Sequence, residues 1–228
     1  MEWVLFVSQL LNGLQLGVLL FLLAAGLTLV FGIMDFVNLA HGSLYMMGAY
    51  FCVTLTSALG SFPLAVLLAV ILTFILGIAV ELIVSRHLYQ RDHLDQVLAT
   101  FGLILFFNGA VHLIWGPEGN PIALPDYLNG RISLPAGIEI PTFRLVIIAI
   151  GLAVAVGLIW LVTKTRMGML IRAGASNRRM AGALGVDIRK LFTLVFALGA
   201  AMAGLAGMMI APITEANIGR GDDILIVA

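Results

Sequence analysis

The chain has 228 residues, of which 61% are hydrophobic and only 11% are charged, and its formal net charge is zero. Ordinary soluble domains carry about a quarter of charged residues, whereas apolar runs of about 18 or more residues with almost no charge are typical of membrane-spanning helices. The zero net charge excludes attraction of the whole chain to nucleic acid, so no nucleic-acid partner is expected. Composition predicts an all-α protein, a polytopic transmembrane helical bundle that forms one domain over residues 1–228.

The first apolar run covers residues 3–34 without a charged side chain. One helix of this length would measure about 48 Å, against a hydrocarbon core of about 30 Å, and Asn12 with its polar neighbours interrupts the run. We therefore expect residues 3–12 to lie at the membrane interface or strongly tilted, and residues 14–34 to form the first full span. A weaker second segment covers residues 36–59. The further expected spans are residues 63–84, 97–115, 145–162 and 191–211, the last of them ended by Pro212.

Two of the segments between the spans differ in charge and in proline content. Residues 116–142 hold five of the seven prolines and a single basic residue, and Asn129-Gly130 within them is a hairpin-turn signal. Residues 164–190 hold seven basic residues against one acid. Because Lys and Arg gather in cytoplasmic loops, we expect 164–190 to be cytoplasmic and 116–142 to be an ordered loop on the outer side with a small hairpin. The side of the N-terminus depends on whether residues 36–59 cross the membrane or only dip into it. A new apolar run at 224–228 predicts that further spans follow.

A polar patch interrupts the second segment. Ionisable groups at membrane depth are expensive and suggest a functional site, and His41 is such a group, while Asp35 is expected at the cytoplasmic edge. On a helix Asn38, His41 and Tyr45 would share one face. Gly42 and Gly48 permit a close backbone approach or a break, and a broken helix is tolerated at depth where it lines a cavity. Two interpretations stay open: the patch lines a substrate path, or it is a buried polar network that ties two helices together.

The basic loop contains a predicted short helix over residues 177–184. Ser176 is suited to cap its start, and Gly185 is suited to end it. Such a helix is expected either to lie on the membrane surface, held by arginine and anionic lipid, or to dock in a groove of a cytoplasmic partner. Its apolar face would consist of Met180, Ala183 and Leu184, with Arg178 and Arg179 lying off that face.

Other features carry weaker signals. Gly199, Ala203 and Gly207 recur every four residues and predict a close helix contact, inside the chain or at a subunit interface. Glu81 near the inner end of its span can pair with Arg86. No metal motif, nucleophile elbow or phosphate-binding glycine loop is present in the sequence, so we expect no cofactor, no metal site and no enzymatic activity in this chain itself.

Two stretches resemble a known family. The stretch GIMDFVNLAHGSLYMMGAY, residues 32–50, resembles the signature near the N-terminus of the branched-chain amino acid ABC transporter permeases. The stretch ASNRRMAGALGVDIRKLFTLVFALGAAMAGLAG, residues 175–207, resembles the cytoplasmic coupling loop and the following span of that family. The resemblance extends over essentially the whole chain and is nearest to the H-type permease subunits.

The resemblance implies a function and a set of partners. A bacterial inner-membrane permease would move leucine, isoleucine and valine, together with a second, different permease subunit, two cytoplasmic ATP-binding subunits and a periplasmic amino-acid-binding protein. The outer loop, residues 116–142, would be a periplasmic loop that faces the binding protein. Residues 174–185 would be the coupling helix that docks on an ATP-binding subunit. The candidates for the substrate path are Asn38, His41, Gly42 and Tyr45. The candidates for ATPase coupling are Arg178, Arg179, Met180, Ala183, Leu184 and Gly185.

The alternative function is an ion-coupled secondary transporter or a channel for small amino acids. Such a protein would need no ATP-binding subunit, and His41 together with Asp35 would carry protons. Uptake driven by a proton gradient, with this chain alone in a vesicle, discriminates the alternative from the ATP-driven importer.

Overall fold

The computed structural model describes residues 2–117, 122, 124–125, 127–134 and 138–214. Within these residues six helices are long and apolar enough to cross a membrane, which confirms the predicted all-α polytopic bundle. They are α1 (Glu2–Met34), α2 (His41–Leu59), α3 (Phe62–Ile83), α4 (His93–Trp115), α5 (Thr142–Lys164) and α8 (Ile188–Thr214). The shorter elements are the 3-10 helix η1 (Ser85–His87), α6 (Arg166–Ser176), α7 (Arg178–Ala183) and the strands β1 (Arg131–Leu134) and β2 (Ile138–Pro141).

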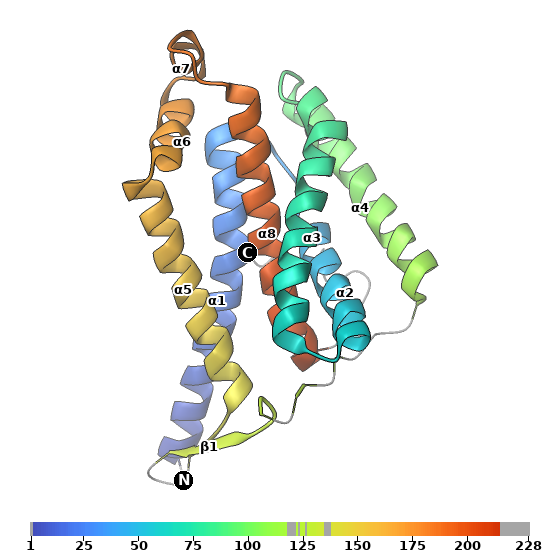
Figure 1. Cartoon of the computed structure of the whole chain (residues 1–228), viewed down its shortest axis with the longest axis vertical. Helices are drawn as coiled ribbons and strands as arrows, with labels where there is room; N and C mark the ends of the chain where they lie inside the picture. The colour runs from blue at the N-terminus through green and yellow to red at the C-terminus, as the bar shows by residue number, and fades with distance from the viewer. Residues whose placement is uncertain (1, 118–121, 123, 126, 135–137, 215–228) are drawn as a thin grey trace.

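Helix α8 is the central element of the bundle, where it packs against α1, α2 and α3 (Figure 1). The helices approach closely because glycines face one another. A Cβ atom on Gly199 would collide with the backbone of α1 at Gly26, and one on Gly48 of α2 would collide with the backbone at Gly204. Gly207 lies directly against the backbone of α2. The predicted small-residue face of α8 therefore packs inside the chain, where it lets the backbones of neighbouring helices approach.

Helix α1 is continuous from Glu2 to Met34, so the expected division into an interfacial part and a span is wrong. Its first turns extend past the other helices toward the strands (Figure 1), with Trp3 and Phe6 exposed. Asn12 and its neighbours do not end the helix, because an interior Asn, Gly or Gln costs about 1 kcal/mol or less each. The expected end of the sixth span before Pro212 is also wrong, since α8 runs on to Thr214. Transmembrane helices tolerate proline where neighbouring groups satisfy the freed backbone.

The chain between α1 and α2 is not helical. Asp35 has a left-handed φ of 50°, and the backbone that follows runs from the end of α1 back into the bundle, where α2 begins at His41 (Figure 1). Two side chains of α4 bind this backbone: the Val37 amide donates to Oε1 of Gln96 at 3.1 Å, and the Leu39 amide donates to Oγ1 of Thr100 at 3.3 Å. We call residues 35–40 the unwound segment. Together with α2 it returns the chain to the end of the molecule where α1 starts.

The strands form an antiparallel hairpin at that same end, opposite α6 and α7 (Figure 1). Arg131 pairs with Pro141 and Ile132 with Ile140. The predicted hairpin exists, but Asn129-Gly130 precedes β1 and does not connect the two strands. Residues 135–137, which stand between the strands in the sequence, lie outside the described residues. Gly130 instead anchors the start of α5, since its carbonyl accepts from the Thr142 amide at 2.9 Å. Pro125 begins the turn that contains Asn129, because its carbonyl accepts from the Asn129 amide.

Candidate functional site

His41 occupies the first position of α2 and is completely buried against α1. Its Nε2 lies 3.2 Å from the carbonyl oxygen of Leu23. A carbonyl can only accept, so Nε2 carries the proton and Nδ1 is left as an acceptor. Gly26 provides the space, because a Cβ atom there would press on the imidazole ring. The ring thus joins α2 to α1 at the point where α2 begins.

The other path candidates surround His41, but not on one helical face. Asn38 lies in the unwound segment, so the prediction that it shares a helix face with His41 is wrong. His41 and Tyr45 do lie one turn apart on α2, and the side chains of both are buried, as is Gly42. The predicted break occurs upstream of both glycines that suggested it. Gly42 sits in the first turn of α2, and Gly48 serves the contact with α8.

Several buried polar atoms of this region have no hydrogen-bond partner among the described residues. They are both amide atoms of Asn38, Nδ1 of His41, Oγ of Ser43 and the hydroxyl of Tyr50. Buried polar groups in proteins are almost always paired, and leaving one unpaired costs a few kcal/mol. The start of α2 therefore keeps unused donor and acceptor capacity in a place that is otherwise apolar.

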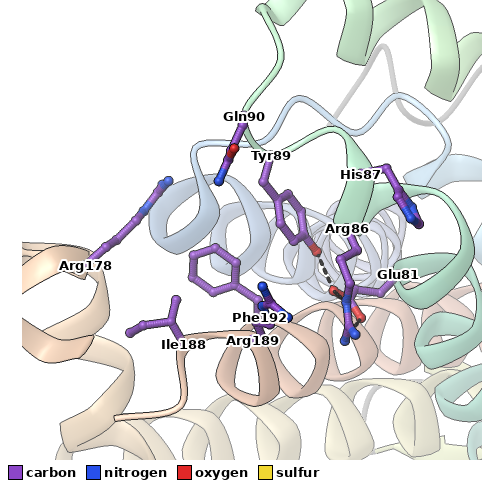
Figure 2. Close-up of a pocket in the computed structure, with 9 residues that line it drawn as sticks. All are labelled: Glu81, Arg86, His87, Tyr89, Gln90, Arg178, Ile188, Arg189 and Phe192. Atoms are coloured by element: carbon purple, nitrogen blue, oxygen red, sulfur yellow. Dashed lines mark hydrogen bonds and ion pairs between the residues drawn. The ribbon is translucent and has the colours of Figure 1, made fainter. Parts of the chain in front are cut away.

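A second polar site lies at the C-terminal end of α3, near α7. The carboxylate of Glu81 is completely buried and accepts from Arg86 with both oxygens, at 3.3 Å from Nε and 3.2 Å from Nη2. Thr193 of α8 donates to it at 2.7 Å. Tyr89 donates to it at 3.0 Å (Figure 2). The predicted pair with Arg86 is confirmed. A buried charge is tolerated when such hydrogen bonds satisfy it fully, and here they join three parts of the chain.

Tyr89 makes two kinds of contact in this site, a hydrogen bond through its hydroxyl and edge-to-face contacts through its ring. Burial, and next the carboxylate of Glu81, raise the pKa of its phenol far above the ordinary value, so the hydroxyl stays protonated and donates. Its ring meets Phe192 of α8 edge to face at a centroid distance of 5.3 Å. It meets Phe36 of the unwound segment in the same manner at 5.6 Å. Both distances lie in the range of favourable aromatic pairs.

A cavity of about 530 Å³ opens beside Tyr89, between η1, α7 and the start of α8 (Figure 2). Arg178, the first residue of α7, lies at its edge with its guanidinium carbon 5.4 Å from the ring centre of Phe192. This distance is within the range of a cation–π contact. Arg86 and Arg189 also line the cavity, so arginines outnumber its one acid, Glu81.

Helix α7 is short but closed at both ends. Asn177, not Ser176, caps its start: Oδ1 of Asn177 accepts from the Met180 amide at 2.9 Å, whereas Ser176 is the last residue of α6. The prediction of Gly185 at the end is confirmed, since it has a φ of 89°. Its amide and that of Val186 donate to carbonyls within the last turn of α7, at 3.0 and 3.1 Å. This is the Schellman arrangement, which suits glycine.

The side chains of α7 face mostly outward. Ala181 is buried against the neighbouring helices, with 4% of its surface exposed, whereas Met180 is 60% and Leu184 is 79% exposed. Arg179, Ala183 and Gly185 are exposed as well, and Arg178 turns inward onto Phe192. We call Met180, Ala183 and Leu184 the apolar face of α7. It leaves an apolar surface uncovered on a helix whose backbone is fully bonded.

Sequence reasoning missed α6 and the aromatic contacts. Thr165 begins α6 as its cap, because its Oγ1 accepts from the Gly168 amide at 3.1 Å, and Arg172 donates to the carbonyl of Val162 in α5. A threonine three residues before Gly168, followed by an amphipathic run, was an available signal for this helix. The contacts of Tyr89 with Phe36 and Phe192 had no signal, since the three residues lie far apart in the sequence.

Comparison with known proteins identifies the family of this chain. The family described as branched-chain amino acid transport system / permease component matches residues 9–225. The chain is 31% identical to the high-affinity branched-chain amino acid transport system permease protein BraD of Pseudomonas aeruginosa, over 90% of this chain and 70% of BraD. It is 28% identical to permease protein LivH of Escherichia coli, over 92% of this chain and 71% of LivH. A probable LivH of Methanocaldococcus jannaschii is 29% identical over 91% of this chain and 67% of that protein.

No solved structure matches the chain significantly. The family match covers nearly all of the described bundle, including the unwound segment, α2 and α7. Six apolar helices agree with a multi-pass protein of the inner membrane. The chain belongs to the family of permease components of branched-chain amino acid transport systems.

Proposed function

We propose that this chain is a permease subunit of an ATP-driven importer that carries leucine, isoleucine and valine across the inner membrane. The relatives BraD and LivH are named as high-affinity branched-chain amino acid permeases, and they match this chain over about nine tenths of its length. The partners in this proposal are a second, different permease, two cytoplasmic ATP-binding subunits and a periplasmic amino-acid-binding protein. The proposed orientation places the hairpin loop, residues 116–142, outside and the basic loop, residues 164–190, in the cytoplasm.

The observation that carries the proposal is the uncovered apolar face of α7. A helix of six residues is too short to be stable by itself, yet α7 is capped at both ends and held on the bundle through Ala181 and Arg178. The chain thus fixes in position a surface that contributes little to its own packing, since Met180 and Leu184 point away from it. Short apolar helices of this kind dock in a groove of a partner, and here the partner is the ATP-binding subunit.

The proposed substrate path runs beside the unwound segment. In transporters a helix that begins at membrane depth directs its positive N-terminal end toward the anionic group of a substrate, and unwound backbone accompanies it. Helix α2 begins inside the bundle and has no side-chain cap. Three residues before its first residue, the buried side-chain amide of Asn38 has no partner among the described residues. Asn38, His41, Gly42 and Tyr45 are buried in this conformation, so we propose that they contact the path when the unwound segment moves away from α4.

Reconstitution in vesicles tests the function. The chain, the second permease and the ATP-binding subunits are incorporated together, the binding protein is added outside, and uptake of labelled leucine is measured. We expect uptake that requires ATP and the binding protein, and that stays unchanged when a proton gradient is dissipated. Uptake by this chain alone, driven by a proton gradient without ATP, would contradict the proposal and support the secondary transporter instead.

A further inference from the structure

Three ring contacts form an unbroken line from α7 to the unwound segment. The guanidinium of Arg178 lies over Phe192, Phe192 meets Tyr89 edge to face, and Tyr89 meets Phe36 in the same way, at 5.4, 5.3 and 5.6 Å. Figure 2 shows the side chain of Phe192 between those of Arg178 and Tyr89. Phe36 stands two residues before Asn38, in the unwound segment. We call Arg178, Phe192, Tyr89 and Phe36 the aromatic line.

We infer that the aromatic line transmits a displacement of α7 to the unwound segment, so that Tyr89, Phe192 and Phe36 are positioning residues for the opening of the path at Asn38 and His41. The inference rests on the proposed function, because it takes α7 as the surface on which the ATP-binding subunit acts. It adds the receiving element and the residues that connect it.

The packing makes this line stiff in its middle. Tyr89 is fixed by its hydrogen bond to Glu81, and Glu81 is fixed in turn by Arg86 and Thr193. Phe192 directly precedes Thr193 on α8. The Phe192 ring and the Thr193 hydroxyl therefore attach the same turn of α8 to the Glu81 network. Packed side chains that cannot compress pass a displacement on instead of absorbing it. Movement of Arg178 is therefore expected to shift Phe192 and Tyr89 together.

The receiving end is the element best suited to move. Helical backbone bonds reach the unwound segment only at its ends, from the Asp35 amide to Phe31 and from the Leu44 amide to Ala40. Between them, side chains of α4 hold two of its amides, those of Val37 and Leu39. Phe36 is fully buried against Tyr89 and Phe196. A push on this ring acts on a short stretch of backbone that is held by few bonds and that leads directly into the buried polar atoms at the start of α2.

The first test separates transmission from packing with leucine substitutions in the assembled transporter. We expect Phe36→Leu and Phe192→Leu each to lower uptake per ATP hydrolysed about tenfold, while ATP-binding subunits still co-purify. The double variant is expected to lose no more than the stronger single variant, because both changes interrupt one line. Phe192→Tyr keeps the ring and is expected to retain uptake. The control is Phe62→Leu, a buried ring paired with Phe143 at 5.7 Å near the hairpin end.

The second test follows the unwound segment itself. Cys52 is the single cysteine of the sequence, so Leu39→Cys in a Cys52→Ala background gives one reporter thiol. In the assembled transporter we expect ATP to raise the rate at which a small maleimide labels this thiol. Adding Phe192→Leu should abolish that rise, and adding Phe62→Leu should leave it intact. Equal ATP-dependent labelling with and without Phe192→Leu, or additive losses in the double variant, would overturn the inference.

The outcomes also separate this inference from the proposed function. If the unsubstituted transporter requires ATP and co-purifies with its ATP-binding subunits, the proposed function stands. In that case normal uptake by both leucine variants refutes the aromatic line alone. If the unsubstituted chain neither binds those subunits nor requires ATP, the proposed function fails and the inference fails with it.

Discussion

The start of α2 and the helix α7 carry the two sequence motifs that point to transport, and their surroundings are opposite. At the start of α2, His41 and Asn38 are buried, and several of their polar atoms lack a partner among the described residues. In α7, the backbone is hydrogen-bonded at both ends, while the side chains of Met180 and Leu184 are exposed. One region holds unused polar capacity inside the chain, and the other holds unused apolar surface outside it.

This difference indicates how each region depends on a partner. An uncovered apolar face becomes favourable only when another surface covers it, so α7 is expected to matter for assembly and little for the stability of the chain alone. Unpaired polar atoms in an apolar interior are unfavourable until water, a substrate or a rearrangement pairs them. The start of α2 is therefore expected to matter for both stability and transport. The following predictions test this contrast, from the largest effect to the smallest.

The largest effect is expected from Gly48→Val, in the middle of α2. Its side chain would collide with the backbone of α8 at Gly204, and overpacking of this kind costs about 1–3 kcal/mol or more. We expect little folded protein after extraction in mild detergent. Gly102→Val is the matched control, because Gly102 lies on α4 with open space around it. The amount of monodisperse protein is measured by size exclusion, and equal recovery of both variants would contradict the close contact.

His41→Ala is expected to have the next largest effect. It removes the hydrogen bond to Leu23 and leaves a cavity at a completely buried position, together worth about 2–4 kcal/mol. We expect a clearly lower unfolding temperature in detergent and a lower yield. His112→Ala, at an exposed histidine near the end of α4, serves as control. Normal stability with abolished uptake would show instead that His41 acts mainly in the substrate path.

The sequence predicted much of the fold because hydropathy alone defines apolar spans. The pairing of Glu81 with Arg86 was also accessible, since Arg86 is the fifth residue after Glu81 at the end of one span. The position of the break before α2 could not be predicted from the sequence. Glycines 42 and 48 drew attention to the helix, whereas the backbone leaves the helical path at Asp35 and finds its partners in Gln96 and Thr100, about sixty residues away.

The same limit applies to the site near α7. Its apolar face and its closing glycine follow from local helix rules, so they could be predicted within one or two residues. Thr193, Phe192 and Phe36 join Tyr89 and Glu81 only through the packing of α8 and the unwound segment. Such contacts depend on which helices are neighbours, and local sequence patterns do not reveal which helices those are.

Ala183→Arg tests the apolar face of α7 without touching the interior. Ala183 is exposed, so we expect unchanged yield and unfolding temperature for the isolated chain. An arginine in the centre of a docked apolar surface should weaken association with the ATP-binding subunit about tenfold or more. Ala173→Arg on α6, also exposed, is the control. Co-purification of the ATP-binding subunit and ATP-dependent uptake are measured, and normal values for Ala183→Arg would exclude this face as the docking surface.

Asn177→Ala is expected to have the smallest effect, and it tests whether α7 must be folded before the ATP-binding subunit docks. The substitution removes the bond from Oδ1 to the Met180 amide, and loss of an N-cap costs about 1 kcal/mol of helix stability. Because α7 has only six residues, its folded population should fall, and binding of the ATP-binding subunit should weaken about fivefold in proportion. Asn177→Asp keeps the cap and should restore binding. The apolar side chains are identical in all three proteins, so a loss confined to Asn177→Ala would show that the apolar face works through its fixed position. Equal binding by all three would mean that the partner itself folds α7 on docking, and that the capping of α7 serves only the free chain.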